Sequence, residues 1–311
     1  MYKCYNMDKI SNILKEVIDM FINEELSINS NLEKAVEKAA SEIMSKYRNN
    51  DIIDERKISI KSSNDGIIYS VKYVTIKCNI DVFDSNPTPC IVNIYELFDE
   101  ETIDKIYSEL DLGSHLNSNN GSIEINIYSV NKGINLQWLR HLLYHECEHS
   151  LQTYLSNKSI KPNNSYIKAK NIILNNDIRH KSEMFIKVAW LLYYYSKLEI
   201  DGNVNGLYGE MMTDHSIDYE HTNFHRSDIE INEYFEEIIG MIENDELDGV
   251  LQYFGYTSNS FVKYIIRQKK YLKTKVMRVL TLANNKRKSI SENLKKIPNK
   301  LKHKPIGEYI K

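Results

Sequence analysis

Five residues near the middle of the chain, His145-Glu146-Cys147-Glu148-His149, constrain the fold more than any other stretch. On a helix, residues four positions apart lie on one face and on successive turns, so both imidazoles can meet one metal ion if this segment is helical. The glutamate after the first histidine can then act on a water molecule beside the metal. The H-E-x-x-H pattern therefore predicts a helix with a zinc site on one face.

The flanking sequence supports that helix. Residues 121–130 alternate isoleucines with polar side chains, as a half-buried strand does, at Ile123, Ile125 and Ile127. A short turn follows at residues 131–133, and Asn135 is placed to cap a helix that runs to about Leu155.

At 100° per residue this helix has two distinct faces. The apolar face predicts contact with a core and comprises Leu139, Leu143, Cys147, Leu151 and Tyr154. The opposite face carries His141, His145, His149 and Gln152 and is expected to line a cleft. For His141 we expect a structural role, or contact with the metal ligands, and not binding of the metal itself.

Length and composition narrow the class of protein. The 311 residues are 42% hydrophobic and 27% charged, which is typical of a globular protein with one main domain. We expect no membrane span, no secretion signal and a cytoplasmic location, or a virion if a phage encodes the chain. The four cysteines show no C-x-x-C pairing, so we expect reduced thiols at Cys4, Cys78, Cys90 and Cys147.

Charge is distributed unevenly along the chain. Residues 263–311 contain 16 Lys and Arg against Glu292 and Glu308, a local net charge of +14 within an overall −3. This basic segment could contact nucleic acid or an acidic partner, or it could be a solvated helix face with a tail.

Apolar periodicity predicts the remaining elements. We expect two helices within residues 7–47, strands within 58–83 around a turn at 64–66, a strand at 90–95, a helix at 99–110 and a polar loop at 113–120. The first two helices lack an Arg- or Lys-rich recognition helix and a tight glycine turn, which favours a structural hairpin over a DNA reader. Further along we expect a loop at 156–165, one buried helix at 182–198, helices at 228–241 and 258–282, and a basic tail.

Two histidines and a water leave a catalytic zinc site one protein ligand short. No histidine stands six residues past the motif, where Leu155 is found, so the third ligand should be a carboxylate from elsewhere. Glu199 is the best candidate because we expect it at the end of the buried helix, where an unpaired carboxylate is costly. Glu183 is the rival, and Asp201 and Glu210 are weaker candidates.

The run at residues 145–152 together with residues 199–202 resembles the zincin-type, gluzincin-like metallopeptidases. Small bacterial and phage members often read H-E-x-x-H-x-x-Q and later E-x-x-A; here Gly202 replaces that alanine, and both are small. The resemblance implies His145, His149 and Glu199 as Zn²⁺ ligands and Glu146 as general base. It also implies a sheet whose edge strand, expected at 123–130, binds an extended peptide by β-addition.

These observations predict an α+β fold. We expect a zincin-like core, made of a small mixed sheet, an active-site helix and a buried helix, with helical N- and C-terminal additions. The expected division is an N-terminal helical hairpin at 1–55, the metallopeptidase domain at 56–225, and a C-terminal helical region with its basic tail at 226–311.

The favoured function is a zinc-dependent metalloendopeptidase acting on proteins or peptides. One alternative is a phage- or virion-associated or regulatory binding protein that keeps the scaffold and contacts nucleic acid or a partner through residues 263–311. Another is a metal-dependent hydrolase of a different bond. The oxyanion partner is left open among Tyr194, Tyr195, Tyr208, His215 and His221.

Overall fold

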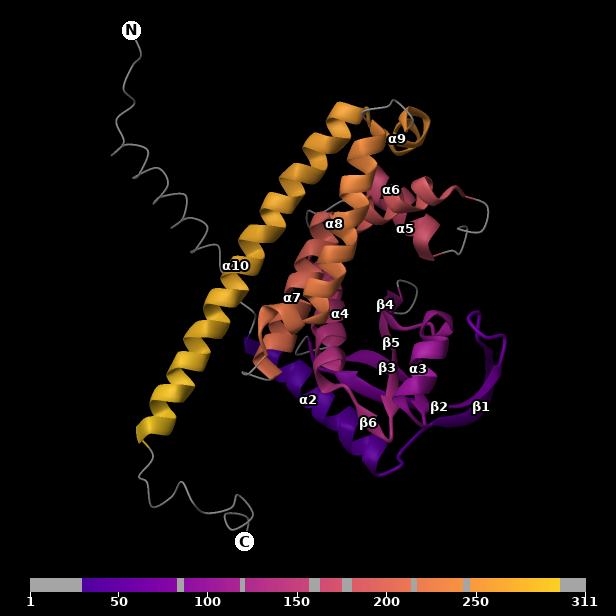
Figure 1. Cartoon of the computed structure of the whole chain (residues 1–311). Helices are drawn as coiled ribbons and strands as arrows, with labels where there is room; N and C mark the ends of the chain where they lie inside the picture. The colour runs from indigo at the N-terminus through magenta and orange to yellow at the C-terminus, as the bar shows by residue number, and fades with distance from the viewer. Residues whose placement is uncertain are drawn as a thin grey trace.

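A computed structural model describes residues 30–82, 87–117, 121–156, 163–174, 181–213, 217–242 and 247–296 (Figure 1). The first predicted helix of the N-terminal hairpin, Cys4, His215 and the end of the basic tail lie outside the described residues.

The described chain contains one mixed β-sheet. Its strands are β1 (Asp54–Lys61), β2 (Ile68–Ile80), β3 (Thr88–Leu97), β4 (Gly113–Asn117), β5 (Ser122–Val130) and β6 (Gly133–Ile134). The strand order is β1-β2-β3-β5-β4, with β6 also paired to β5. The pair β3–β5 is parallel and the other pairs are antiparallel. The predicted α+β class with a small mixed sheet is confirmed.

Two predictions about this end of the sheet were wrong. Residues 113–117, expected to be part of a loop, form β4, and β4 pairs with the first half of β5. Consequently the strand expected at the edge, 123–130, is an inner strand between β3 and β4, and β4 is the edge. The sequence pattern did not predict this strand because Gly113-Ser-His-Leu-Asn has few strand-forming residues. Hydrogen bonding to β5 makes the segment a strand.

The two faces of the sheet pack against different helices. Cys90, Val92 and Ile94 of β3 belong to the main core, together with residues of α2 (Ser30–Arg48) and α4 (Leu136–Ser156). On the opposite face, Tyr95 and Leu97 form a smaller core with α3 (Glu100–Ile106). This alternation follows from the period of two along a strand. Cys78, Cys90 and Cys147 are buried free thiols, as predicted.

The second half of the chain adds helices above and to one side of the sheet (Figure 1). These are α5 (Asn164–Leu174), α6 (Glu183–Tyr194), α7 (Lys197–Thr213), α8 (Asn223–Ile242), α9 (Asp248–Phe254) and α10 (Ser258–Lys296). The single helix predicted over 182–198 is wrong, because the chain breaks after Tyr194 and restarts at Lys197. Glu199 therefore lies in the first turn of α7 and not at the end of a buried helix.

Helix α7 packs closely against α4 because its facing positions are glycines. A Cβ atom at Gly202 would lie 3.0 Å from the His145 ring, and one at Gly206 would lie 2.7 Å from the His141 ring. At Gly209 a Cβ would lie 2.4 Å from the ring of Tyr144. Rings from α4 thus occupy the space that side chains of α7 would need.

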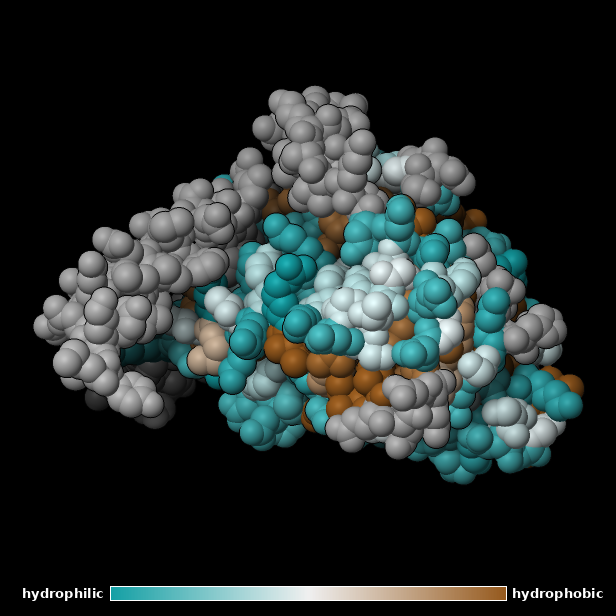
Figure 2. Space-filling view, turned by 90° about the horizontal axis from the view of Figure 1, so that it is seen from above, coloured by the Kyte–Doolittle hydropathy of each residue, from teal (hydrophilic) through white to brown (hydrophobic). Residues whose placement is uncertain are grey.

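Among the helices that the structure describes, none has both the length and the apolar character needed to cross a membrane. Seen from above, the surface shows hydrophobic side chains between hydrophilic ones (Figure 2). Such a mixture is ordinary for a protein surface.

Candidate metal site

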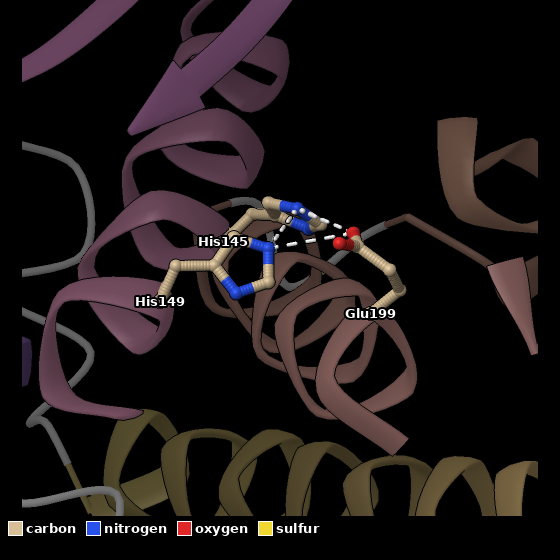
Figure 3. A group of neighbouring side chains, drawn as sticks. All are labelled: His145, His149 and Glu199. Atoms are coloured by element: carbon tan, nitrogen blue, oxygen red, sulfur yellow. Dashed lines mark hydrogen bonds and ion pairs between the residues drawn. The ribbon is translucent and has the colours of Figure 1, made fainter. Parts of the chain in front are cut away.

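Three side chains from two helices converge at the candidate site (Figure 3). His145 and His149 project from successive turns of α4, and Glu199 projects from the first turn of α7. The two histidine Nε2 atoms are 3.0 Å apart. Oε2 of Glu199 lies 3.5 Å from Nε2 of His145 and 3.4 Å from Nε2 of His149. The structure therefore brings together the three residues expected to be ligands.

These separations fit one tetrahedral zinc ion. With zinc–nitrogen and zinc–oxygen bonds of about 2.1 Å, neighbouring ligand atoms of a tetrahedron lie about 3.4 Å apart. The three potential ligand atoms all lie within 4.8 Å of one another. Glu199 is 2% exposed, so its carboxylate has little access to solvent water. Two imidazoles and one carboxylate are a donor set typical of catalytic zinc.

The other carboxylates considered as third ligands lie elsewhere. Glu183 is exposed in the first turn of α6 and pairs with Lys187. Asp201 accepts a hydrogen bond of 2.8 Å from Tyr271 of α10. Glu210 lies 2.7 Å from Nδ1 of His141. Of the four acidic candidates, only Glu199 reaches both histidines of the motif.

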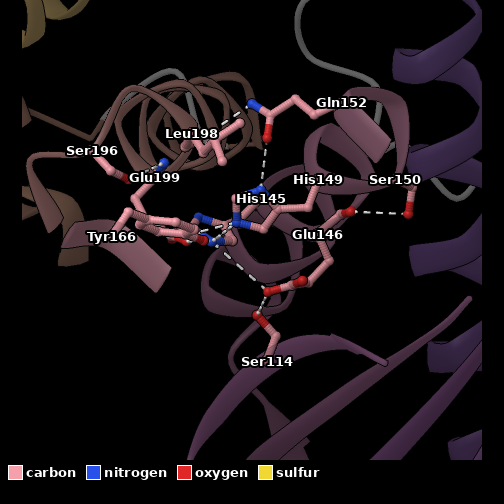
Figure 4. A network of polar contacts seen from close by, with 10 residues as sticks. All are labelled: Ser114, His145, Glu146, His149, Ser150, Gln152, Tyr166, Ser196, Leu198 and Glu199. Atoms are coloured by element: carbon pink, nitrogen blue, oxygen red, sulfur yellow. Dashed lines mark hydrogen bonds and ion pairs between the residues drawn. The ribbon is translucent and has the colours of Figure 1, made fainter. Parts of the chain in front are cut away.

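Glu199 is held at both its backbone and its side chain (Figure 4). Its amide donates to Oγ of Ser196 over 3.2 Å, which makes Ser196 the N-cap of α7. The hydroxyl of Tyr166 donates to Oε1 of Glu199 over 2.8 Å. That contact occupies one carboxylate oxygen and leaves Oε2 beside the two imidazoles.

His149 is oriented by Gln152 on the next turn of α4. Nδ1 of His149 lies 3.0 Å from Oε1 of Gln152. An amide oxygen only accepts, so Nδ1 carries the proton and Nε2 keeps a lone pair for a metal. The Gln152 amide nitrogen donates to the carbonyl of Leu198 over 3.3 Å, which ties the ring to the residue before Glu199.

His141 takes part in a separate buried contact. Besides the His141 ring, the Glu210 carboxylate accepts backbone hydrogen bonds from Asn223 (2.7 Å) and Phe224 (3.2 Å) at the start of α8. The His141 ring also stacks on Trp138 with centroids 5.0 Å apart. The structural role expected for His141 agrees with this placement.

Glu146 lies beside the three converging residues. Its Oε1 accepts a 2.7 Å hydrogen bond from Ser114 of β4 and lies 3.8 Å from Nε2 of His145. The side chain is 2% exposed. Within the described chain, its Oε2 is buried and has no hydrogen-bond partner. A buried carboxylate oxygen without a partner is costly, so this atom fits a site that a water molecule completes.

His149 and Glu199 shift each other's pKa. Burial opposes the charged form of His149, but the neighbouring Glu199 carboxylate outweighs it and raises the pKa of His149 to about 9. Burial likewise opposes the charge on Glu199, yet His149 and His145 bring the pKa of Glu199 well below its ordinary value. Without metal, the site therefore holds a proton that a cation would have to displace.

The tyrosines expected as oxyanion partners have other neighbours. The hydroxyl of Tyr195 donates to Asn232 over 3.2 Å, and the Tyr208 ring packs edge-on against Tyr144. Tyr194 packs edge-on against Tyr195, and its buried hydroxyl has no partner among the described residues. His221 is exposed in a short 3-10 turn.

Sequence reasoning missed two residues of the site, Tyr166 and Ser114. Both come from segments at the edges of predicted loops, α5 and β4, so neither was considered. For Tyr166 a signal existed, since Asn163 caps α5 by accepting from the Tyr166 amide over 2.7 Å. Ser114 offered no comparable local pattern.

Comparisons with protein-family models, with curated proteins and with solved structures gave no match.

Proposed function

We propose that this protein is a zinc-dependent hydrolase of peptide bonds. His145, His149 and Glu199 would hold the ion, and Glu146 would act as general base. The observation that carries the proposal is the buried Oε2 of Glu146, which has no partner among the described residues and lies beside a His₂Glu donor set of zinc-like dimensions. A structural zinc site has no need of such a base.

The chemistry follows from the position of Glu146. A bound zinc ion would supply Lewis-acid character, lowering the pKa of a water and polarising a substrate carbonyl. Glu146 accepts the proton of the attacking water on Oε2 and returns it to the leaving amine nitrogen. Ser114 keeps Oε1 occupied during both transfers.

The edge position of β4 favours a peptide as the substrate. Ser114, which contacts Glu146, is part of β4, and β4 ends the sheet on this side. An extended peptide that added to β4 as a further strand would run past the general base. This transfers the peptide-binding role that the resemblance implied from 123–130 to residues 113–117.

Substitution of Glu146 tests the catalytic assignment. Glu146→Gln keeps the shape of the side chain but removes its basicity, so we expect zinc content to be unchanged and peptide hydrolysis to fall by roughly 10²- to 10⁴-fold. Turnover of a peptide pool and metal content by mass spectrometry are the measurements. Undiminished turnover in this variant would refute the role of Glu146.

The ligand set is tested by comparing Glu199→Ala with Glu183→Ala. We expect one zinc per chain in the wild type and in Glu183→Ala, and little zinc in Glu199→Ala. Equal zinc content in both variants would contradict the assignment. Parallel screening of ester and amide substrates separates a peptidase from a hydrolase of another bond.

A further inference from the structure

The 39-residue helix α10 spans about 58 Å and lies along one side of the molecule (Figure 1). Its apolar stripe is already buried in the core, at Phe261, Ile265, Leu272, Val276, Val279 and Ala283. Between Phe261 and Ala283 the helix therefore presents its opposite face to solvent. From Ser258 to Ser291 its sequence contains no acidic residue.

Two groups of cations on α10 differ in their surroundings. The first faces acidic groups of the body, as in Lys275–Asp201 at 3.5 Å and Lys286–Glu33 at 3.6 Å. The second group, which we call the outer cation row, is exposed and comprises Lys263, Arg267, Lys270 and Lys273. Among the residues that the structure describes, these four have no acidic partner.

We infer that the outer cation row of α10 binds the phosphate backbone of nucleic acid, without reading its sequence. The row covers about 15 Å with neighbours roughly 5–6 Å apart, so several phosphates of one strand can be contacted together. No acidic side chain of the described residues pairs with the row, and the sequence after residue 296 has further cations at Lys300, Lys302 and Lys304. This inference does not depend on the zinc site.

An anionic membrane fits this surface less well. A helix that lies on a membrane inserts a continuous apolar stripe, and the apolar stripe of α10 is buried inside the protein. The large apolar side chains exposed on the described part of α10 are Ile266, Met277 and Leu282, which are separated along the helix. Because these three side chains do not form a continuous stripe, the outer cation row is the main feature of the exposed face of α10.

The test measures binding of the full chain to a labelled DNA duplex of roughly 25 base pairs by fluorescence anisotropy, at about 50 to 200 mM salt. The variant Lys263→Gln/Arg267→Gln/Lys270→Gln/Lys273→Gln removes the row and retains helix-forming residues. Each lost phosphate contact should reduce the slope of log K against log salt by about 0.9, so the slope should fall by about 3 to 4.

A matched variant separates the row from overall charge. Arg48→Gln/Lys57→Gln/Lys61→Gln/Lys77→Gln removes the same charges from exposed positions on α2 and the sheet. We expect this variant to keep the wild-type slope and affinity. Circular dichroism and zinc content should match the wild type in both variants.

Several outcomes would overturn the inference. They are absence of duplex binding by the wild type at the lowest salt, equal losses in the two variants, and an unchanged slope in the row variant. Binding to vesicles that contain anionic lipid, or to an acidic peptide, in preference to DNA would assign the row to a different partner.

Discussion

At the scale of single residues, Gly202 decides how closely α7 approaches the two imidazoles. A Cβ atom there would lie 3.0 Å from Cε1 and Nδ1 of His145 and 3.2 Å from Cε1 of His149. Such contacts are tighter than ordinary packing allows, so a methyl group must displace the rings.

Gly202→Ala is therefore expected to weaken zinc binding by about tenfold, since small displacements of ligands carry large costs in affinity. Gly240→Ala is the matched control, because nothing lies within 4 Å of a Cβ atom at that position of α8. The control should keep zinc affinity and gain up to about 1 kcal/mol of stability from helix propensity. Equal affinities in both variants would show that the rings can move without cost.

The protonation state of His149 predicts how zinc binding depends on pH. Its pKa of about 9 in the metal-free site means that zinc displaces a proton at neutral pH. Apparent zinc affinity should therefore rise about tenfold per pH unit up to about pH 9 and then level off. Calorimetry in buffers of different ionisation enthalpy should detect release of about one proton per zinc at pH 7.

The same pKa sets the stability of the metal-free protein. The folded value of about 9 exceeds the ordinary 6.5, so the favourable contribution of protonated His149 is fully present below pH 6.5 and is lost as the pH rises through 9. The stabilisation that bound zinc provides rises with pH over the same range, because zinc affinity rises. The increase in Tm that zinc produces should thus be larger at pH 8.5 than at pH 6.5.

At the scale of elements, the N-cap of α7 positions a metal ligand. Ser196-Lys197-Leu198-Glu199 reads as a capping box, S-x-x-E, in which the glutamate usually turns back toward the cap. Here the Ser196 hydroxyl accepts from the Glu199 amide, while the Glu199 carboxylate faces the histidines. The sequence of a helix start thus also supplies a candidate ligand.

Ser196→Ala should lower stability by about 1 kcal/mol and also weaken zinc binding, because the first turn of α7 carries Glu199. Ser182 provides a matched control, since its hydroxyl caps α6 by accepting from the Phe185 amide over 3.3 Å. Ser182→Ala should have a similar cost in stability, measured by chemical denaturation, and leave zinc affinity unchanged. A loss of affinity in both variants would indicate a general effect of destabilisation.

Local pattern predicted some elements and missed others for identifiable reasons. Helix α4 was predicted because apolar periodicity, the Asn135 cap and the motif agree, and Asn135 does accept from the Trp138 amide over 3.0 Å. The break between α6 and α7 was missed because apolar and helix-forming residues continue across it, although the S-x-x-E pattern marked it. Strand β4 could not be predicted, since pairing with β5 determines it.

At the scale of the whole molecule, distant segments share one core. Buried residues from Leu32 of α2 to Ala283 of α10 belong to the same cluster, which includes the apolar face of α4. The division into 1–55, 56–225 and 226–311 stays a prediction. Approach of Glu199 to the two histidines was expected because the site lacked a third ligand and an unpaired buried carboxylate is costly, and the resemblance implied the same residue. The separate helix α7 that carries Glu199 was not foreseen.

Removal of metal should destabilise this shared core. Zinc bound between α4 and α7 adds stability by mass action, about 2.7 kcal/mol at a free concentration of 100 times Kd. A chelator should therefore lower Tm in the wild type and have little effect on Glu199→Ala. An equal decrease in both would indicate an effect of the chelator unrelated to this site.

Placing one ligand in the opening turn of α7 has a kinetic consequence. Helix ends fray far more often than whole domains unfold, so that turn can withdraw its carboxylate while α4 retains both imidazoles. Escape of a captured ion would then track local opening at residues 197–199. The amides of Glu199 and Ile200, which donate to Ser196, should therefore exchange faster in variants from which the ion dissociates faster.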